Sequence, residues 1–153
     1  MEEQAAPRPT AVRRQDTLHR LEQDVDLWVA TADPATGDPA LVPLSYLWDG
    51  TTLLLSTEAT TPTARNLGVG RKARLALGPT RDVTMIDAEC EAVVPAGEIP
   101  AAVGDAFAAR TGFDPRADPE SYRYFRLRPV RIQAWREANE LPGRTLMIKG
   151  RWR

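Results

Sequence analysis

Apolar and polar residues alternate along most of this chain, and this pattern predicts strands rather than helices. Successive residues of a strand point to opposite faces, so a period of two marks a strand with one buried face. Strands are therefore expected at 27–33, 39–48, 51–57, 73–77, 83–94 and 124–136. On the 83–94 strand, Ile86, Ala88 and Cys90 fall on the apolar face. We interpret Cys90, the only cysteine, as a buried small apolar residue rather than a nucleophile.

Two turns are predicted between the first three strands. Gly37 in the loop at 34–37 is the expected left-handed residue. Asp49-Gly50 favours the positive φ angles of a two-residue hairpin turn, so 41–48 and 51–57 should pair antiparallel. Pro43 cannot donate to the ladder, so the backbone of its strand is expected to be open on one side.

Three helices are predicted from apolar spacing and end signals. At 12–25, apolar residues recur every three to four positions, with Asp16 as a possible cap. A short helix of about two turns should have Thr61 as its N-cap, Pro62 as its first residue and Gly68 as its stop. The third helix, at 99–110, should end at Gly112. Six strands with short helices favour a small barrel or closed sheet with helices against its ends.

Hydroxyl side chains gather where the third strand meets the short helix. Free N–H groups of Thr63 and Ala64, the neighbouring hydroxyls and the Arg65 guanidinium are expected to converge there, an arrangement that attracts phosphate. The hydroxyl groups belong to Ser56, Thr57, Thr60, Thr61 and Thr63. The alternative is that they only cap the helix and finish the strand.

Composition limits the classes of function. The 153 residues, 42% of them hydrophobic, predict a polar, mobile arm at 1–10 and a single domain at 11–153. The net charge of −1 and the scattered basic residues argue against nucleic acid and against an anionic membrane as partners. No apolar run approaches the roughly 20 residues of a membrane span, and the N-terminus lacks a signal-peptide core, so a cytoplasmic location is expected.

The chemistry-bearing residues are few. His19 is the only histidine and Cys90 the only cysteine, which argues against a zinc site and against Cys-His catalysis. The sequence shows neither a paired carboxylate site nor a catalytic triad. This composition is consistent with chemistry that is carried by a bound cofactor.

The run PALVPLSYLWDGTTLLLST at 39–57, followed by Arg65-Asn66-Leu67, resembles the split β-barrel proteins related to pyridoxamine 5'-phosphate oxidase. Members of this family bind flavin mononucleotide (FMN) or the deazaflavin coenzyme F420. The resemblance covers residues 18–94 well and the remainder loosely. It implies a mainly β fold, a six-stranded antiparallel split β-barrel with short flanking helices, that pairs as a homodimer with two cofactor sites at the subunit interface.

The resemblance also implies residue roles. The edge of the isoalloxazine or deazaflavin ring would lie against the backbone of Val42, Pro43, Leu44 and Ser45. Ser56 and Thr57 would meet the polyol chain or the phosphate, and Arg65 and Asn66 match the family's Arg-Asn pair near the phosphate.

The family commonly has basic residues where this chain has Thr61 and Thr63. Each missing cation removes a charge-assisted hydrogen bond of about 1.5–3 kcal/mol. Either the hydroxyls and helix N–H groups suffice, or the ligand is less anionic, or the site has lost its cofactor.

Three functional hypotheses follow. The first is an oxidoreductase that transfers a hydride between bound FMN or F420 and a small acceptor. The second is a non-catalytic module that binds the cofactor or heme, and the third is a cofactor-free structural homologue. The C-terminal Arg151-Trp152-Arg153 places an indole between two guanidinium groups and is expected to dock on a neighbouring subunit.

Overall fold

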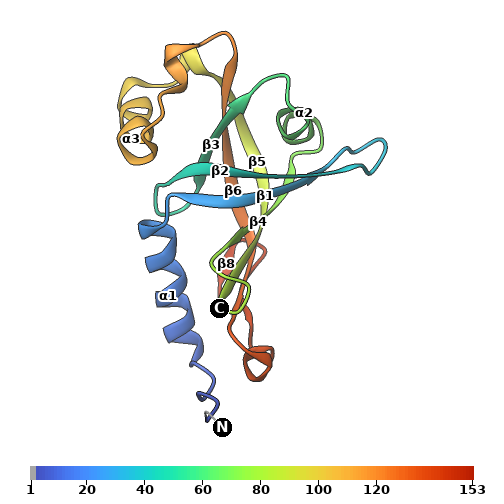
Figure 1. Cartoon of the computed structure of the whole chain (residues 1–153), viewed down its shortest axis with the longest axis vertical. Helices are drawn as coiled ribbons and strands as arrows, with labels where there is room; N and C mark the ends of the chain where they lie inside the picture. The colour runs from blue at the N-terminus through green and yellow to red at the C-terminus, as the bar shows by residue number, and fades with distance from the viewer. Residues whose placement is uncertain (1–2) are drawn as a thin grey trace.

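Six antiparallel strands close into a barrel at the centre of the molecule (Figure 1). The computed structural model describes residues 3–153. Around the barrel the strand order is β3-β2-β1-β4-β5-β6, and pairing of β3 with β6 closes the ring. All six predicted strands and the mainly β barrel are confirmed. The strands are β1 (Asp26–Ala32), β2 (Pro39–Trp48), β3 (Leu53–Glu58), β4 (Lys72–Leu77), β5 (Val83–Pro95) and β6 (Tyr122–Trp135).

The connection between β2 and β3 differs from the predicted two-residue turn. Trp48 pairs with Leu53, so the loop spans residues 49–52. The Asp49 carboxylate accepts hydrogen bonds from the backbone N–H groups of Thr51 (2.9 Å) and Thr52 (2.6 Å). This side-chain acceptor takes the place of ladder pairing for two residues that the alternation had assigned to the strand.

Three α-helices flank the barrel: α1 (Thr10–Gln23), α2 (Pro62–Val69) and α3 (Ala101–Thr111). In Figure 1, α1 runs beside the lower part of the long strands, whereas α2 and α3 lie at the upper end. Short 3-10 turns occupy η1 (Ala96–Glu98), η2 (Pro115–Ala117) and η3 (Ala138–Glu140). None of the helices in residues 3–153 is both long enough and apolar enough to cross a membrane.

The predicted helix ends are partly right. The Thr61 side chain accepts from Ala64 N, and Gly112 ends α3 with a φ of 73°, so both caps are confirmed. Asp16 lies inside α1, whose N-cap position is Pro9, so the predicted aspartate cap is wrong. The α2 helix continues past Gly68 and has Gly70 as its C-cap residue.

Two apolar clusters divide the core. The barrel interior is filled by residues such as Val29, Leu75 and Ile86, all 0% exposed. A smaller cluster beneath α3 contains Leu54, Ala96, Phe107 and Tyr124. Strand β3 serves both clusters, because Leu53 and Leu55 point into the barrel while Leu54 points toward α3. Cys90 is buried in the barrel core as predicted, and its desolvation raises the pKa of the thiol.

The C-terminal residues extend the sheet beyond the barrel. Strand β7 (Thr145–Ile148) pairs with β6, and β8 (Arg151–Trp152) pairs with β7. Trp152 packs against the barrel core, and the Arg14 guanidinium lies 4.9 Å from its ring centroid. The tail therefore packs on its own chain, and its contact with a neighbouring subunit stays a prediction.

The residues just before α1 contact the rest of the fold. Met1 and Glu2 lie outside the described residues. Arg8 is bound to Glu140 through its backbone N (2.8 Å) and its guanidinium Nη2 (2.8 Å), and Thr10 is already helical. The part of the arm next to α1 is therefore attached to the fold.

Candidate functional site

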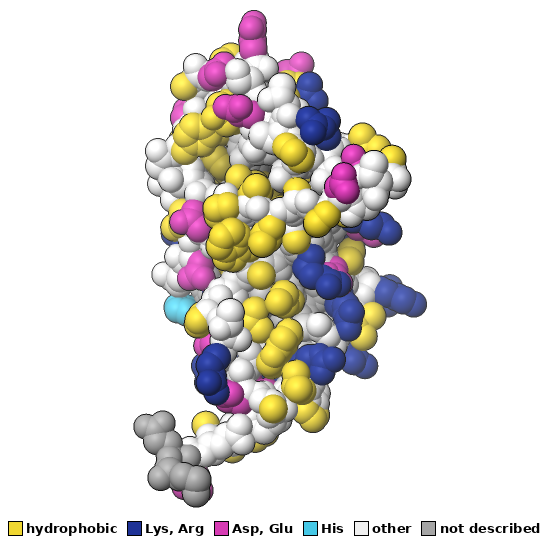
Figure 2. Space-filling view, turned by 45° about the vertical axis from the view of Figure 1, so that its right-hand side comes forward, with side chains coloured by type: hydrophobic (Ala, Val, Ile, Leu, Met, Phe, Trp, Pro, Cys, Tyr) yellow, Lys and Arg dark blue, Asp and Glu magenta, His cyan; other side chains and the backbone are white. Residues whose placement is uncertain are grey.

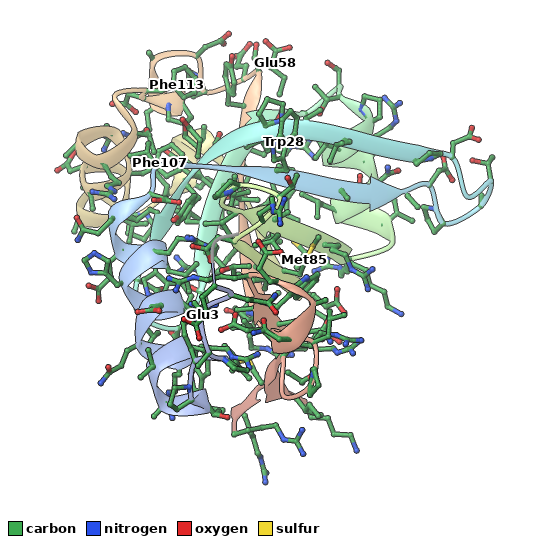
Figure 3. All side chains as sticks on the ribbon, turned by 60° about the horizontal axis from the view of Figure 1, so that its bottom comes forward. Glu3, Trp28, Glu58, Met85, Phe107 and Phe113 are labelled. Carbon is green, nitrogen blue, oxygen red and sulfur yellow. The ribbon has the colours of Figure 1, made fainter. Side chains whose placement is uncertain are left out.

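A pocket of about 440 Å³ opens between the β2–β3 part of the barrel, the start of α2 and the segment that follows α3. Six predicted site residues line it: Pro43, Leu44, Ser45, Ser56, Thr57 and Thr61. The remaining lining residues are Glu58, Phe107, Phe113 and Tyr122. Figure 3 labels three of these, and Glu58 and Phe113 lie there at the same end of the molecule.

The open side of β2 lies at this pocket. Residues Pro39–Ser45 pair with β1, whereas β3 pairs only with Tyr46–Trp48. Within the described residues, the 39–45 part of β2 therefore has a partner strand on one side only. This agrees with the prediction that Pro43 leaves its strand open on one side.

Most hydroxyl groups around the pocket are already hydrogen-bonded. Ser56 Oγ donates to the Arg123 carbonyl (3.0 Å). Thr61 Oγ1 donates to the Glu58 carbonyl (2.9 Å) and accepts from Ala64 N (3.2 Å). The Ala64 N–H, which was expected to be free, is therefore occupied by the cap itself.

Four predicted site residues do not line the pocket: Val42, Thr63, Arg65 and Asn66. Thr63 is 2% exposed, and the exposed Arg65 donates from Nη1 to the Thr60 carbonyl (2.7 Å). Asn66 is 5% exposed, and its Nδ2 donates to Thr31 Oγ1 (3.1 Å), which ties α2 to β1. The expected convergence of Thr63, Ala64 and Arg65 on one phosphate position is not formed in this structure.

The aromatic side of the pocket was missed by sequence reasoning. The rings of Phe113 and Tyr122 meet edge to face with centroids 5.1 Å apart, and Tyr122 Oη donates to Glu58 Oε1 (3.4 Å). Desolvation and the Glu58 carboxylate raise the pKa of Tyr122. In the register of β3 with β6, Glu58 stands opposite Tyr122. That pairing was the missing signal, because neither strand reveals it alone.

The pocket is lined by a single charged side chain, which is acidic. Glu58 is the one charged side chain that lines it, and no Lys or Arg of residues 3–153 forms an ion pair with this carboxylate. Some other surface carboxylates are paired, as in Arg74–Asp87 (2.6 Å) and Arg126–Asp49 (3.1 Å).

A second hollow of about 570 Å³ lies on the outer face of β1, β4 and β5. Small side chains, among them Ala30 and Ala32, line it together with the charged residues Lys72, Arg74, Asp87 and Glu89. None of its lining residues was predicted as a site residue.

The match of this chain to known proteins agrees with the barrel fold. Residues 18–136 match the sequence model of the family described as pyridoxamine 5'-phosphate oxidase. The chain belongs to this family. No protein of curated function matches the sequence significantly.

Solved structures share the fold at low sequence identity. One is called an F420 reductase (20% identity, TM-score 0.61, 74% of this chain and 93% of that chain). A second is a putative pyridoxamine 5'-phosphate oxidase from Listeria innocua (14%, 0.62, 80% and 98%). A third is HutZ, the heme storage protein from Vibrio cholerae (17%, 0.61, 78% and 92%).

Proposed function

We propose that this chain binds a flavin or deazaflavin, FMN or coenzyme F420, and transfers a hydride between this cofactor and a small acceptor. The observation that carries the proposal is the pocket at the open side of β2. Its volume of about 440 Å³ lies within the roughly 300–1,000 Å³ typical of small-molecule sites. Family membership and the fold shared with an F420 reductase support the same class of ligand.

The residues present fit a planar heterocycle. The backbone of Pro43, Leu44 and Ser45 borders the pocket where β2 lacks a second partner strand, so peptide groups are available to the edge of a ring. Phe113, which is 44% exposed, supplies apolar contact area on the other side. Flat apolar walls with a few polar groups at the edge suit a fused ring system.

The chain's contribution is to bind and orient the ring. When bound, the cofactor supplies the hydride chemistry. Ser45 Oγ donates to the Asp26 carboxylate, which holds this side chain at the pocket wall. In this proposal the hydride transfer itself requires no proton transfer by a protein side chain.

The outward face of the sheet supports a homodimer. Trp28 (50% exposed) stands between Pro43 and Ala76, and Leu41 (63% exposed) is opposite Ala30. Figure 2 shows hydrophobic side chains gathered across the middle of one face, beside a group of Lys and Arg. Exposed apolar area of this kind marks an association surface, and a second copy is the partner that we propose.

Heme binding by a non-catalytic module is the second candidate, because a heme storage protein shares the fold. The only histidine, His19, lies on α1 and does not line the pocket, so a heme there would need another axial ligand.

The proposal is tested by absorption spectroscopy after separate incubation with FMN, riboflavin, F420 and heme. We expect at least one flavin or deazaflavin to bind at about one equivalent per chain, and the Ser45→Phe variant, which fills the pocket, to lose this binding. Thr80→Phe, at an exposed site in the β4–β5 loop, is the matched control and should bind normally. Absence of flavin and deazaflavin binding in the wild-type chain would overturn the proposal.

Turnover separates the enzyme from the binding module. A bound cofactor that is reduced by NAD(P)H, or exchanged with reduced F420, should then reduce an added acceptor repeatedly. Reduction that stops after one equivalent would favour the binding module.

A further inference from the structure

The polar end of the pocket has few hydrogen-bond donors left for an anion. Its lining hydroxyls belong to Ser45, Ser56, Thr57, Thr61 and Tyr122. Four of the five already donate to acceptors of the protein: the Asp26 carboxylate, the Arg123 carbonyl, the Glu58 carbonyl and the Glu58 carboxylate. Of these five hydroxyls, only that of Thr57 donates to no acceptor within residues 3–153.

The cation nearest along the chain lies outside the pocket. Arg65 points its Nη1 at the Thr60 carbonyl (2.7 Å) and does not line the pocket. Tight phosphate sites combine guanidinium or ammonium groups with several N–H donors. Here the N–H of Ala64 is taken by the cap, and Thr63 as a whole residue is only 2% exposed, so α2 presents few accessible donors.

The one charge at the pocket is negative, like that of a phosphate. The Glu58 carboxylate stands at the end of β3, and its nearest hydrogen-bond donor is Tyr122 Oη at 3.4 Å. A phosphate dianion placed beside this carboxylate would be repelled, and the repulsion would weaken with added salt.

We infer that this pocket selects a planar ligand without a terminal phosphate. It therefore binds riboflavin, which is neutral, in preference to its phosphorylated form, FMN. The inference rests on the proposed function, because it names the ligand class of the same pocket. The carboxylate of Glu58 and the occupied hydroxyls of Ser56 and Thr61 determine the selection. Aromatic and backbone contacts, which ignore the phosphate, supply the affinity.

Riboflavin and FMN test the inference directly, since they share the ring and the polyol and differ by the phosphate. Their dissociation constants would be measured by quenching of flavin fluorescence at low ionic strength. We expect riboflavin to bind at least tenfold more tightly than FMN, with a smaller ratio at high salt.

Two variants connect the preference to named residues. Glu58→Gln removes the charge and should reduce the riboflavin-to-FMN preference several-fold, whereas Glu98→Gln, an exposed acidic residue outside the pocket, should leave the preference unchanged. Thr57→Arg, which adds a cation at a lining position, should shift the preference toward FMN.

The outcomes separate the inference from the proposed function. Equal or tighter binding of FMN would overturn the inference and leave the proposed flavin site standing. Preference for riboflavin that persists undiminished in Glu58→Gln would overturn the role of the carboxylate. Failure of every flavin and deazaflavin to bind would overturn both.

Discussion

Two glutamates at opposite ends of the barrel differ in how many hydrogen bonds their carboxylates accept. Glu140, 3% exposed, accepts hydrogen bonds from the backbone N, Nε and Nη2 of Arg8 and from the backbone N of Arg136. Glu58, exposed at the pocket, has one bond of 3.4 Å. A buried carboxylate without hydrogen-bond partners would destabilise the protein, and the fold supplies Glu140 with such partners. The Glu58 carboxylate remains available to a ligand.

The saturated end attaches α1 to the barrel. Arg13, 4% exposed, donates to the carbonyls of Ala134 (3.2 Å), Glu140 (2.8 Å) and Pro142 (3.3 Å). We refer to Arg8, Arg13 and Glu140 as the clamp. It joins the residues before and within α1 to the segment between β6 and β7. The comparison shows a carboxylate saturated by hydrogen bonds at one end of the barrel and, at the other, a pocket carboxylate with no ion pair among the described residues.

Breaking the clamp should have the largest effect. Glu140→Gln removes the buried carboxylate that Arg8 binds through Nε and Nη2, and leaves the guanidinium with only its more exposed partner Asp16 (2.9 Å). The free energy of unfolding should fall by about 3–5 kcal/mol. Urea denaturation followed by circular dichroism measures the loss. Glu137→Gln, which breaks the exposed pair with Arg81, is the control and should change stability far less. Equal losses in the two variants would remove the distinction between buried and exposed pairs.

The second largest effect should be a loss of stability at low pH, caused by protonation of Glu140 in the clamp. Hydrogen bonds from Arg8 lower the pKa of Glu140 from its ordinary value of 4.5 to about 2. Because the folded-state pKa is depressed, the stabilisation is complete above about pH 4.5 and is lost as the pH falls toward 2, by about 3 kcal/mol.

Denaturation at several pH values, compared with Glu140→Gln, isolates this contribution. The wild-type protein should lose more stability than the variant between pH 4.5 and 2. Parallel curves would show that Glu140 does not carry the acid sensitivity.

At the pocket end, a smaller effect is expected from the helix cap. Thr61→Ala removes the acceptor for Ala64 N and should cost about 1 kcal/mol. Thr60→Ala is the control, since Thr60 contributes its carbonyl rather than its side chain to the Arg65 bond. Thermal unfolding of both variants checks the difference. A loss in Thr60→Ala as large as that in Thr61→Ala would argue against the cap as the cause.

The smallest effect should come from a substitution of Tyr124, and this change in the free energy of unfolding should have the opposite sign to the others. Its buried hydroxyl is the one buried side-chain polar atom in residues 3–153 without a hydrogen-bond partner. Tyr124→Phe removes this unpaired group and should be neutral or stabilise the protein by up to about 1 kcal/mol. Tyr46→Phe, which deletes the bond to the Leu21 carbonyl (2.9 Å), should destabilise it by about 1 kcal/mol. Chemical denaturation of the pair would reveal equal losses if the Tyr124 hydroxyl were in fact satisfied.

Local chemistry made much of the fold predictable. Alternation marked all six barrel strands, because each has at least one buried face, and Thr61 and Gly112 marked helix ends through their own side-chain and backbone preferences. The loop at 49–52 was missed because the Asp49 carboxylate competes with strand pairing, which a dipeptide signal does not register.

The pocket was predictable only on its β2 and β3 side. Pro43 and the hydroxyl cluster are close in sequence, whereas Phe113 and Tyr122 are distant from them in sequence. The β3–β6 register brings Tyr122 to the pocket, and Phe113 packs against its ring. The clamp was invisible for the same reason, since Arg8 and Glu140 are 132 positions apart.

Cys90 gives the molecule an internal reporter. It is 3% exposed in the middle of β5, next to a register shift against β6, and its Sγ contacts the Ala92 carbonyl (3.4 Å). A thiol reagent added to the native protein reaches this sulfur only when strands separate. The rate of labelling therefore counts how often the barrel opens, without any mutation or attached probe, and a ligand that holds the barrel closed would slow it.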